Sequence, residues 1–108
     1  MDIIFHEKIY RDGISQREWK HIQKKVKQKR AKLNLYFITL PLFDNGILEI
    51  YWYPELLQKA YKDLQAKMIV VGIAHSREEA YEQIEEIVTD VGWQTGEIPI
   101  TEYFRERI

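Results

Sequence analysis

The chain has 108 residues and a mass of 13.1 kDa, with 45% hydrophobic residues, 31% charged residues, five Gly, three Pro and no Cys. This composition is that of a single globular domain over residues 1–108, and it excludes collagen, low-complexity and disulfide-stapled proteins. Sixteen basic and 17 acidic residues leave a net charge of −1. No apolar run approaches 18 residues and the N-terminus lacks a secretory signal, so we expect a cytoplasmic protein with no membrane partner.

The first two elements are predicted to be a strand and a basic helix. Residues 3–10 alternate loosely between apolar and polar side chains, as in a half-solvated edge strand. Ser15 and Glu18 have the spacing of a capping box, which places the start of a helix there. We expect this helix to span residues 15–33. Its narrow apolar stripe consists of Trp19, Ile22, Val26 and Leu33.

The middle of the chain predicts a hairpin, a short helix and a buried strand. Residues 35–40 and 47–52 are rich in β-branched and aromatic side chains, and an Asn-Gly turn joins them. Pro54 suits the first turn of a short amphipathic helix. Residues 68–74 are apolar at every position, which favours a central strand covered on both faces.

The C-terminal part predicts a third helix over residues 76–91. Ser76 and Glu79 form a second capping box, and Gly92 is a fitting helix end. The residues after it are expected to form a loop, followed by a short last turn from Thr101.

The resulting fold class is α+β, with about four strands in a mixed sheet and three helices. The order β-α-β-β-α-β-α formally matches the ferredoxin-like plan, which places the first strand centrally. Here the first strand is the most polar and the fourth is the most apolar. We therefore favour a sheet with the fourth strand inside, the third strand parallel to it through a right-handed crossover, and helices on both faces.

Three segments resemble parts of small bacterial proteins of undescribed function. They are residues 37–42, residues 48–51, and residues 70–74 followed by an acidic amphipathic helix. The resemblance covers roughly residues 35–105 and implies a short, stand-alone, cytoplasmic chain. It implies no specific activity.

The charge of the predicted basic helix is its most conspicuous feature. From Arg17 to Lys32 there are eight basic residues and one acid, Glu18, which gives this segment a net charge of +7. Such a face suits phosphate groups, because each neutralised phosphate releases a counterion. Nucleic acid and an acidic protein are candidate partners, and a solvated helix face is the alternative. The candidate polyanion-binding residues are Arg17, Lys20, Lys24, Lys25, Lys27 and Lys32.

The helix over residues 76–91 carries the opposite charge. It has six acids and a single basic residue, Arg77. If this face meets the basic face of a second chain, the protein forms a homo-oligomer; a solubilising surface is the alternative. Glu82, Glu85 and Glu86 have no histidine at helical spacing, so no metal site is predicted.

A second candidate site rests on the strand order. Parallel third and fourth strands would end side by side, and crevices at such ends commonly bind ligands. Two helix N-termini would offer N–H groups to an anion there, and His75 would act as an acid or base. Core packing of the tyrosines is the alternative. The residues of this possible ligand crevice are Tyr51, Tyr53, His75, Ser76 and Arg77.

These patterns favour a non-enzymatic interaction module that contacts a polyanion or an acidic protein through residues 15–33. The alternatives are a small-molecule or anion-binding domain, with or without enzymatic activity, and a self-associating structural protein. No catalytic residue and no cofactor is predicted, because the chain has no glycine-rich phosphate loop and both of its serines are explained as helix caps.

Overall fold

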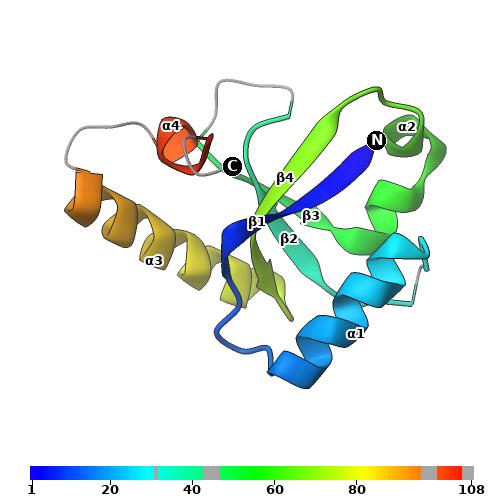
Figure 1. Cartoon of the computed structure of the whole chain (residues 1–108), viewed down its shortest axis with the longest axis horizontal. Coiled ribbons are helices and arrows are strands. Elements are labelled where there is room, and N and C mark those ends of the chain that lie inside the picture. Colours follow the sequence, from blue (N-terminus) through cyan, green and yellow to red (C-terminus); the bar gives the residue numbers. More distant parts are fainter. Residues whose placement is uncertain (31, 43–46, 96–99, 106–108) are drawn as a thin grey trace.

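The computed structural model describes residues 1–30, 32–42, 47–95 and 100–105. They form a four-stranded mixed sheet with helices on both faces (Figure 1). In chain order the elements are β1 (Asp2–Tyr10), α1 (Gln16–Lys27), β2 (Tyr36–Thr39), β3 (Glu49–Trp52), the 3-10 helix η1 (Tyr53–Leu57), α2 (Lys59–Lys62), β4 (Lys67–Ala74), α3 (Arg77–Thr95) and α4 (Ile100–Arg105).

The strands are ordered β1-β4-β2-β3 in the sheet. β4 pairs in parallel with β1 and antiparallel with β2, which pairs antiparallel with β3. The predicted inner position of the fourth strand and edge position of the first are confirmed. The third strand runs in the same direction as β4, but the prediction that the two are neighbours is wrong, because β2 lies between them. β2 takes this inner place because Phe37, Ile38 and Thr39 are all buried, whereas Trp52 of β3 is exposed at the edge.

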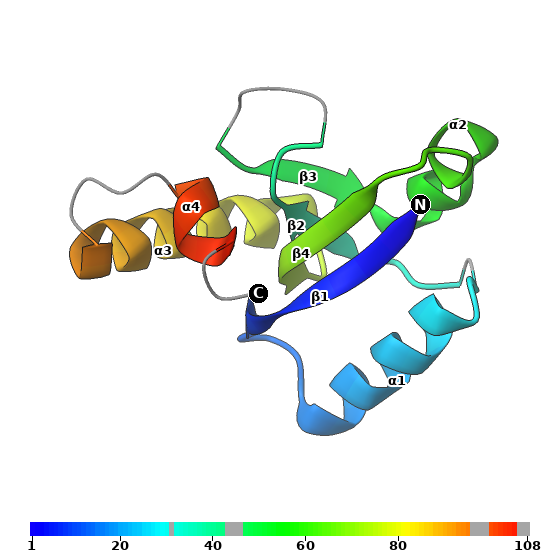
Figure 2. The same ribbon diagram turned by 45° about the horizontal axis from the view of Figure 1, so that its top comes forward.

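One face of the sheet is covered by α1, η1 and α2 (Figure 2). Ile22 and Val26 anchor α1 on this face, and Tyr53 and Leu56 anchor η1. Trp19 packs at the side of the same core with its ring edge-on to Phe5, at a centroid distance of 5.0 Å. This packing fixes the orientation of α1 on the sheet.

The opposite face carries α3 and α4. α4 is held through His6, a buried residue of β1. The Nε2–H of His6 donates to the carbonyl of Phe104 at 2.8 Å, and its Nδ1 accepts from the backbone N–H of Lys8 at 2.9 Å. Both ring nitrogens are thus satisfied, so His6 has a structural explanation. The expected return of the last turn to the body is confirmed, because Tyr103 and Phe104 are buried.

β4 contains a bulge at Val71. Ile38 pairs with Gly72 and Thr39 with Val70, which leaves Val71 opposite no residue of β2. The bulge directs Gly72 toward α3, where the buried side chain of Gln83 lies directly over its α-carbon. Gln83 donates its Nε2–H to the carbonyl of Ile73 at 3.2 Å. A Cβ at position 72 would collide with the Gln83 Oε1, so any larger residue there would have to displace this buried side chain.

The helix starts agree with the predicted caps, and the helix ends differ from prediction. Ser15 Oγ and Ser76 Oγ each accept a backbone N–H three residues later, from Glu18 and Glu79, at 3.1 Å. α1 ends at Lys27 instead of residue 33, α3 continues to Thr95 instead of residue 91, and the helix expected after Pro54 is divided into η1 and α2. The loop expected over residues 93–98 is wrong for residues 93–95, which belong to α3; its remaining residues 96–98 and the predicted turn at residues 44–46 lie outside the described residues.

Candidate functional site

α1 presents the predicted basic surface. Because Ile22 and Val26 face the sheet, the helical period places four basic residues on the opposite side of α1: Arg17, Lys20, Lys24 and Lys27. Of the six predicted residues, Lys25 is half-buried and the other five are exposed. Lys32 lies in the segment that follows the helix. We call this set the α1 basic surface: Arg17, Lys20, Lys24, Lys25, Lys27 and Lys32.

The α1 basic surface has no acidic partner in the part of the chain that the structure describes. In the described part of the chain, ion pairs join His75 to Glu18 and to Glu79. None of them involves a lysine or an arginine. The basic groups therefore repel one another without local compensation. An anionic partner that neutralises them would remove this repulsion.

Aromatic stacking is not available beside these charges. Trp19, at the start of the apolar stripe, is half-buried against Phe5 and is covered by the guanidinium of Arg11, 5.4 Å from the ring centroid. A surface that stacks bases needs exposed aromatic rings among its basic residues. The geometry thus suits contacts with phosphates more than contacts with bases.

The two tyrosines of the predicted crevice lie in the core on the α1 face. Tyr53 is fully buried, with its ring 5.3 Å from that of Phe37. Tyr51 is also buried, and its hydroxyl donates to Glu49 at 3.0 Å. Burial and this hydrogen bond both raise the pKa of Tyr51. Neither tyrosine lines the pocket that contains His75, because β2 separates the ends of β3 and β4.

The other three residues of that crevice follow β4 directly. Ser76 caps α3. Arg77 lies over the ring of Tyr36, with its guanidinium carbon 5.4 Å from the centroid. His75 contacts two carboxylates, with its Nε2 2.9 Å from Glu18 and its Nδ1 3.7 Å from Glu79.

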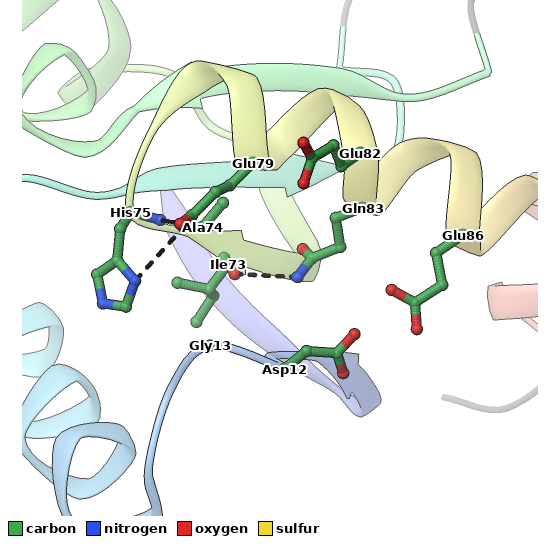
Figure 3. Close-up of a pocket in the computed structure, with 9 residues that line it drawn as sticks. All are labelled: Asp12, Gly13, Ile73, Ala74, His75, Glu79, Glu82, Gln83 and Glu86. Carbon is green, nitrogen blue, oxygen red and sulfur yellow. Dashed lines mark hydrogen bonds and ion pairs between the residues drawn. The ribbon is translucent and has the colours of Figure 1, made fainter.

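His75 lines a pocket of about 220 Å³ at the carboxyl ends of β1 and β4, the two strands that are adjacent and parallel (Figure 3). Its wall on the other side is the first three turns of α3. The predicted location at parallel strand ends thus has a pocket, formed by a different pair of strands. The lining residues are Asp12, Gly13, Ile73, Ala74, His75, Glu79, Glu82, Gln83 and Glu86.

The charge of this pocket is strongly negative. Four carboxylates line it, and their charge repels anions. The pocket therefore does not suit the anionic ligand that a helix N-terminus by itself would attract. A hydrogen bond to Asp12, together with partial burial and the negative charge of Asp12, raises the pKa of Glu86 to about 7. Glu86 therefore holds a proton at pH values where an ordinary glutamate has lost it.

Of the nine pocket residues, only His75 was predicted as a site residue, and five of the eight others have polar side chains. Glu79, Glu82, Gln83 and Glu86 recur at intervals of three and four along α3, which places them on one helix face. That spacing was visible in the sequence. The approach of Asp12 was not, because it depends on the pairing of β1 with β4. No group of three or more His, Asp or Glu side chains within the described ranges is arranged to hold a metal ion.

Comparisons with known proteins give no relative for this chain. No family model matches it, and neither a curated protein nor a solved structure does so. Within the described residues, none of the helices is both long enough and apolar enough to cross a membrane. The functional argument therefore rests on the geometry and charge of the two regions above.

Proposed function

We propose that this protein is a non-enzymatic binding module of the cytoplasm that contacts the phosphate backbone of nucleic acid through the α1 basic surface. The observation that carries this proposal is the set of basic side chains on α1 and the segment directly after it, exposed in all but one case, with no acidic partner among the described residues. Phosphates supply that partner. Counterion release from the nucleic acid then provides the driving force.

The packing of α1 supports this role. Ile22 and Val26 fix the helix on the sheet. The backbone positions of Lys20 and Lys24 are therefore held one helical turn apart. A fixed surface loses less conformational entropy on binding than a flexible basic tail does. With no exposed aromatic residue on α1, we expect little sequence preference.

The distribution of acidic residues also supports it. α3, with six acids between residues 77 and 91, covers the sheet face opposite to α1 (Figure 2). A polyanion on α1 is thereby separated from these carboxylates by the sheet. The net charge of the chain is only −1, but the positive charge is concentrated at α1. A polyanion is therefore expected to bind on that side only.

The test is charge reversal on α1 with a matched control elsewhere. Lys20→Glu combined with Lys24→Glu replaces two positive charges of the α1 basic surface with two negative charges. Lys59→Glu combined with Lys67→Glu makes the same change at exposed positions of α2 and β4. Binding to a labelled DNA duplex is measured at low salt, and thermal unfolding shows whether each variant is folded.

We expect the α1 variant to lose at least tenfold in affinity at unchanged thermal stability, and the control to lose far less. Equal losses in the two variants would show a response to net charge alone and would overturn the proposal. Binding of an acidic protein, without binding to DNA, would redirect the same surface to a protein partner. Light scattering at low and high salt shows whether α1 and α3 of two copies associate instead.

A further inference from the structure

A second, larger cavity lies on the α1 face of the sheet, at the opposite end of β1 from the His75 pocket. Its volume is about 470 Å³, within the range of small-molecule sites. β1, the last turn of α1 and η1 contribute to its walls. The apolar lining residues belong to the core of this face or pack against it: Met1, Ile3, Phe5, Val26, Leu56 and Leu57.

The polar part of the lining is basic. Lys27 and Lys29 come from the end of α1, and Lys62 comes from α2. All three side chains belong to exposed residues, and none has an ion pair within the described part of the chain. Asp2 is the one acid among the lining residues. The cavity thus combines an apolar wall with an excess of positive charge.

Lys29 occupies a position where glycine is preferred. It follows the cap of α1 with a φ of 55°, in the left-handed region. Its N–H bonds to the carbonyl of Val26, and the N–H of Arg30 bonds to that of Lys25, both at 3.0 Å, as in a Schellman motif. A side chain in this conformation has a strain cost that glycine avoids. Strain of this kind is common where a side chain has a function, and this side chain lines the cavity.

Tyr53 adds an unsatisfied polar group to the same site. It is fully buried, it lines the cavity, and its hydroxyl has no hydrogen-bond partner among the described residues. Buried hydroxyls are nearly always satisfied. The hydroxyl itself has almost no accessible surface, so Tyr53 contributes to the wall of the cavity, and the lysines are the groups that can bind an anionic head.

We infer that this cavity binds a small amphipathic carboxylate, an unbranched alkyl chain with one anionic head. The alkyl chain lies against Phe5, Val26 and Leu57, and the head lies among Lys27, Lys29 and Lys62. Charge complementarity selects the anion, and the apolar wall selects the chain. This site is separate from the proposed nucleic-acid contact, although Lys27 belongs to both surfaces.

The experiment is a titration of the folded, full chain with hexanoate, octanoate and decanoate below their micellar concentrations. Methyl NMR spectra report the site, because Ile3, Val26 and Leu57 line the cavity whereas Ile84 and Val88 lie on α3. We expect saturable shifts at the first group only. Affinity should rise about fourfold for each added CH₂ that enters the cavity, which corresponds to about 0.8 kcal/mol.

Three controls separate the head, the chain and a membrane surface. 1-Decanol has the chain without the charge and should bind more weakly than decanoate. Acetate has the charge without the chain and should give no saturable shift. Vesicles of phosphatidylglycerol present anionic heads on a surface, and binding to vesicles without binding to decanoate would overturn the proposal.

Two variants distinguish this site from the α1 basic surface. Lys29→Gln combined with Lys62→Gln should weaken decanoate binding by about two- to fivefold per lysine. Lys20→Gln combined with Lys24→Gln, which removes the same number of charges from α1 away from the cavity, should leave decanoate binding unchanged and weaken DNA binding. Shifts at Ile84 and Val88, or equal effects of these variants on decanoate, would contradict the assignment without touching the nucleic-acid proposal.

Discussion

Glu18 and His75 are 57 residues apart in the chain, and the carboxylate Oε2 of Glu18 lies 2.9 Å from the Nε2 of His75. Glu18 belongs to the first turn of α1, and His75 lies between β4 and α3. The backbone N–H of His75 also donates to Glu79 of α3 at 3.0 Å. This contact therefore joins the start of the basic helix to the start of the acidic helix at one end of the sheet.

We predict that the Glu18–His75 contact orients α1 with a small contribution to stability. The two side chains are 37% and 39% exposed, so solvent screens their attraction. A double-mutant cycle with Glu18→Gln and His75→Gln should give a coupling of about 0.2–1 kcal/mol in urea unfolding. The backbone caps at Ser15 and Ser76 remain in both variants. A coupling of zero would show that the contact does not form in solution.

Gly72→Ala should destabilise the protein by about 1–3 kcal/mol, because the new methyl group meets the buried amide of Gln83. Chemical unfolding measures this loss. Gln83→Ala removes the obstacle, so the double variant should lose less stability than the sum of the single variants. A fully additive pair would contradict the close approach at the bulge.

Glu86 should make the protein less stable as the pH rises toward neutrality. Its pKa is raised from 4.5 to about 7 by the hydrogen bond to Asp12, so the folded chain keeps a proton that the unfolded chain has lost. This contribution is complete below pH 4.5 and is lost as the pH rises through 7. Solvent screening keeps it below about 1 kcal/mol.

Glu86→Gln should flatten that dependence. Thermal unfolding of the wild type and the variant between pH 4 and 8 measures the difference. A wild-type stability that rises steadily over the upper part of this range, with the same slope in the variant, would show that the pKa of Glu86 is not raised by folding.

Lys29→Gly should stabilise the protein by about 0.5–1 kcal/mol, because glycine adopts a φ of 55° without a steric cost. Urea unfolding provides the measurement. The same variant removes a lysine from the cavity, so it should gain stability and lose affinity for decanoate together. A loss of stability would show that the lysine side chain makes contacts that outweigh its backbone strain.

Much of the fold was predictable from local patterns. Ser15 and Ser76 marked both main helix starts, and the apolar run over residues 68–74 placed the fourth strand inside the sheet. The place of β2 was also visible in principle, since Phe37 to Leu40 is more apolar than Glu49 to Trp52. A right-handed crossover favours pairing of the third and fourth strands, but the greater polarity of β3 places it at the edge of the sheet instead.

The rest depended on tertiary structure. α1 ends before residue 33 because Lys29 adopts the left-handed conformation. The sequence has no glycine or proline there, so this helix end could not be predicted. α3 continues past Gly92, a residue with open space around it, so the missing side chain has no packing consequence there. Both cavities combine residues that only the parallel pairing of β1 with β4 and the placement of η1 bring together. The basic residues of α1 were predictable because a helical period alone places them.

The most direct test of the central claim is fluorescence anisotropy of a labelled DNA duplex, titrated with the wild-type protein over a series of salt concentrations. If α1 neutralises three to six phosphates, the logarithm of the binding constant should fall with the logarithm of salt concentration with a slope of about −3 to −5. Replacing Lys20 and Lys24 with Glu should make that slope shallower. Absence of binding at low salt, or binding that does not weaken as salt is added, would contradict the account.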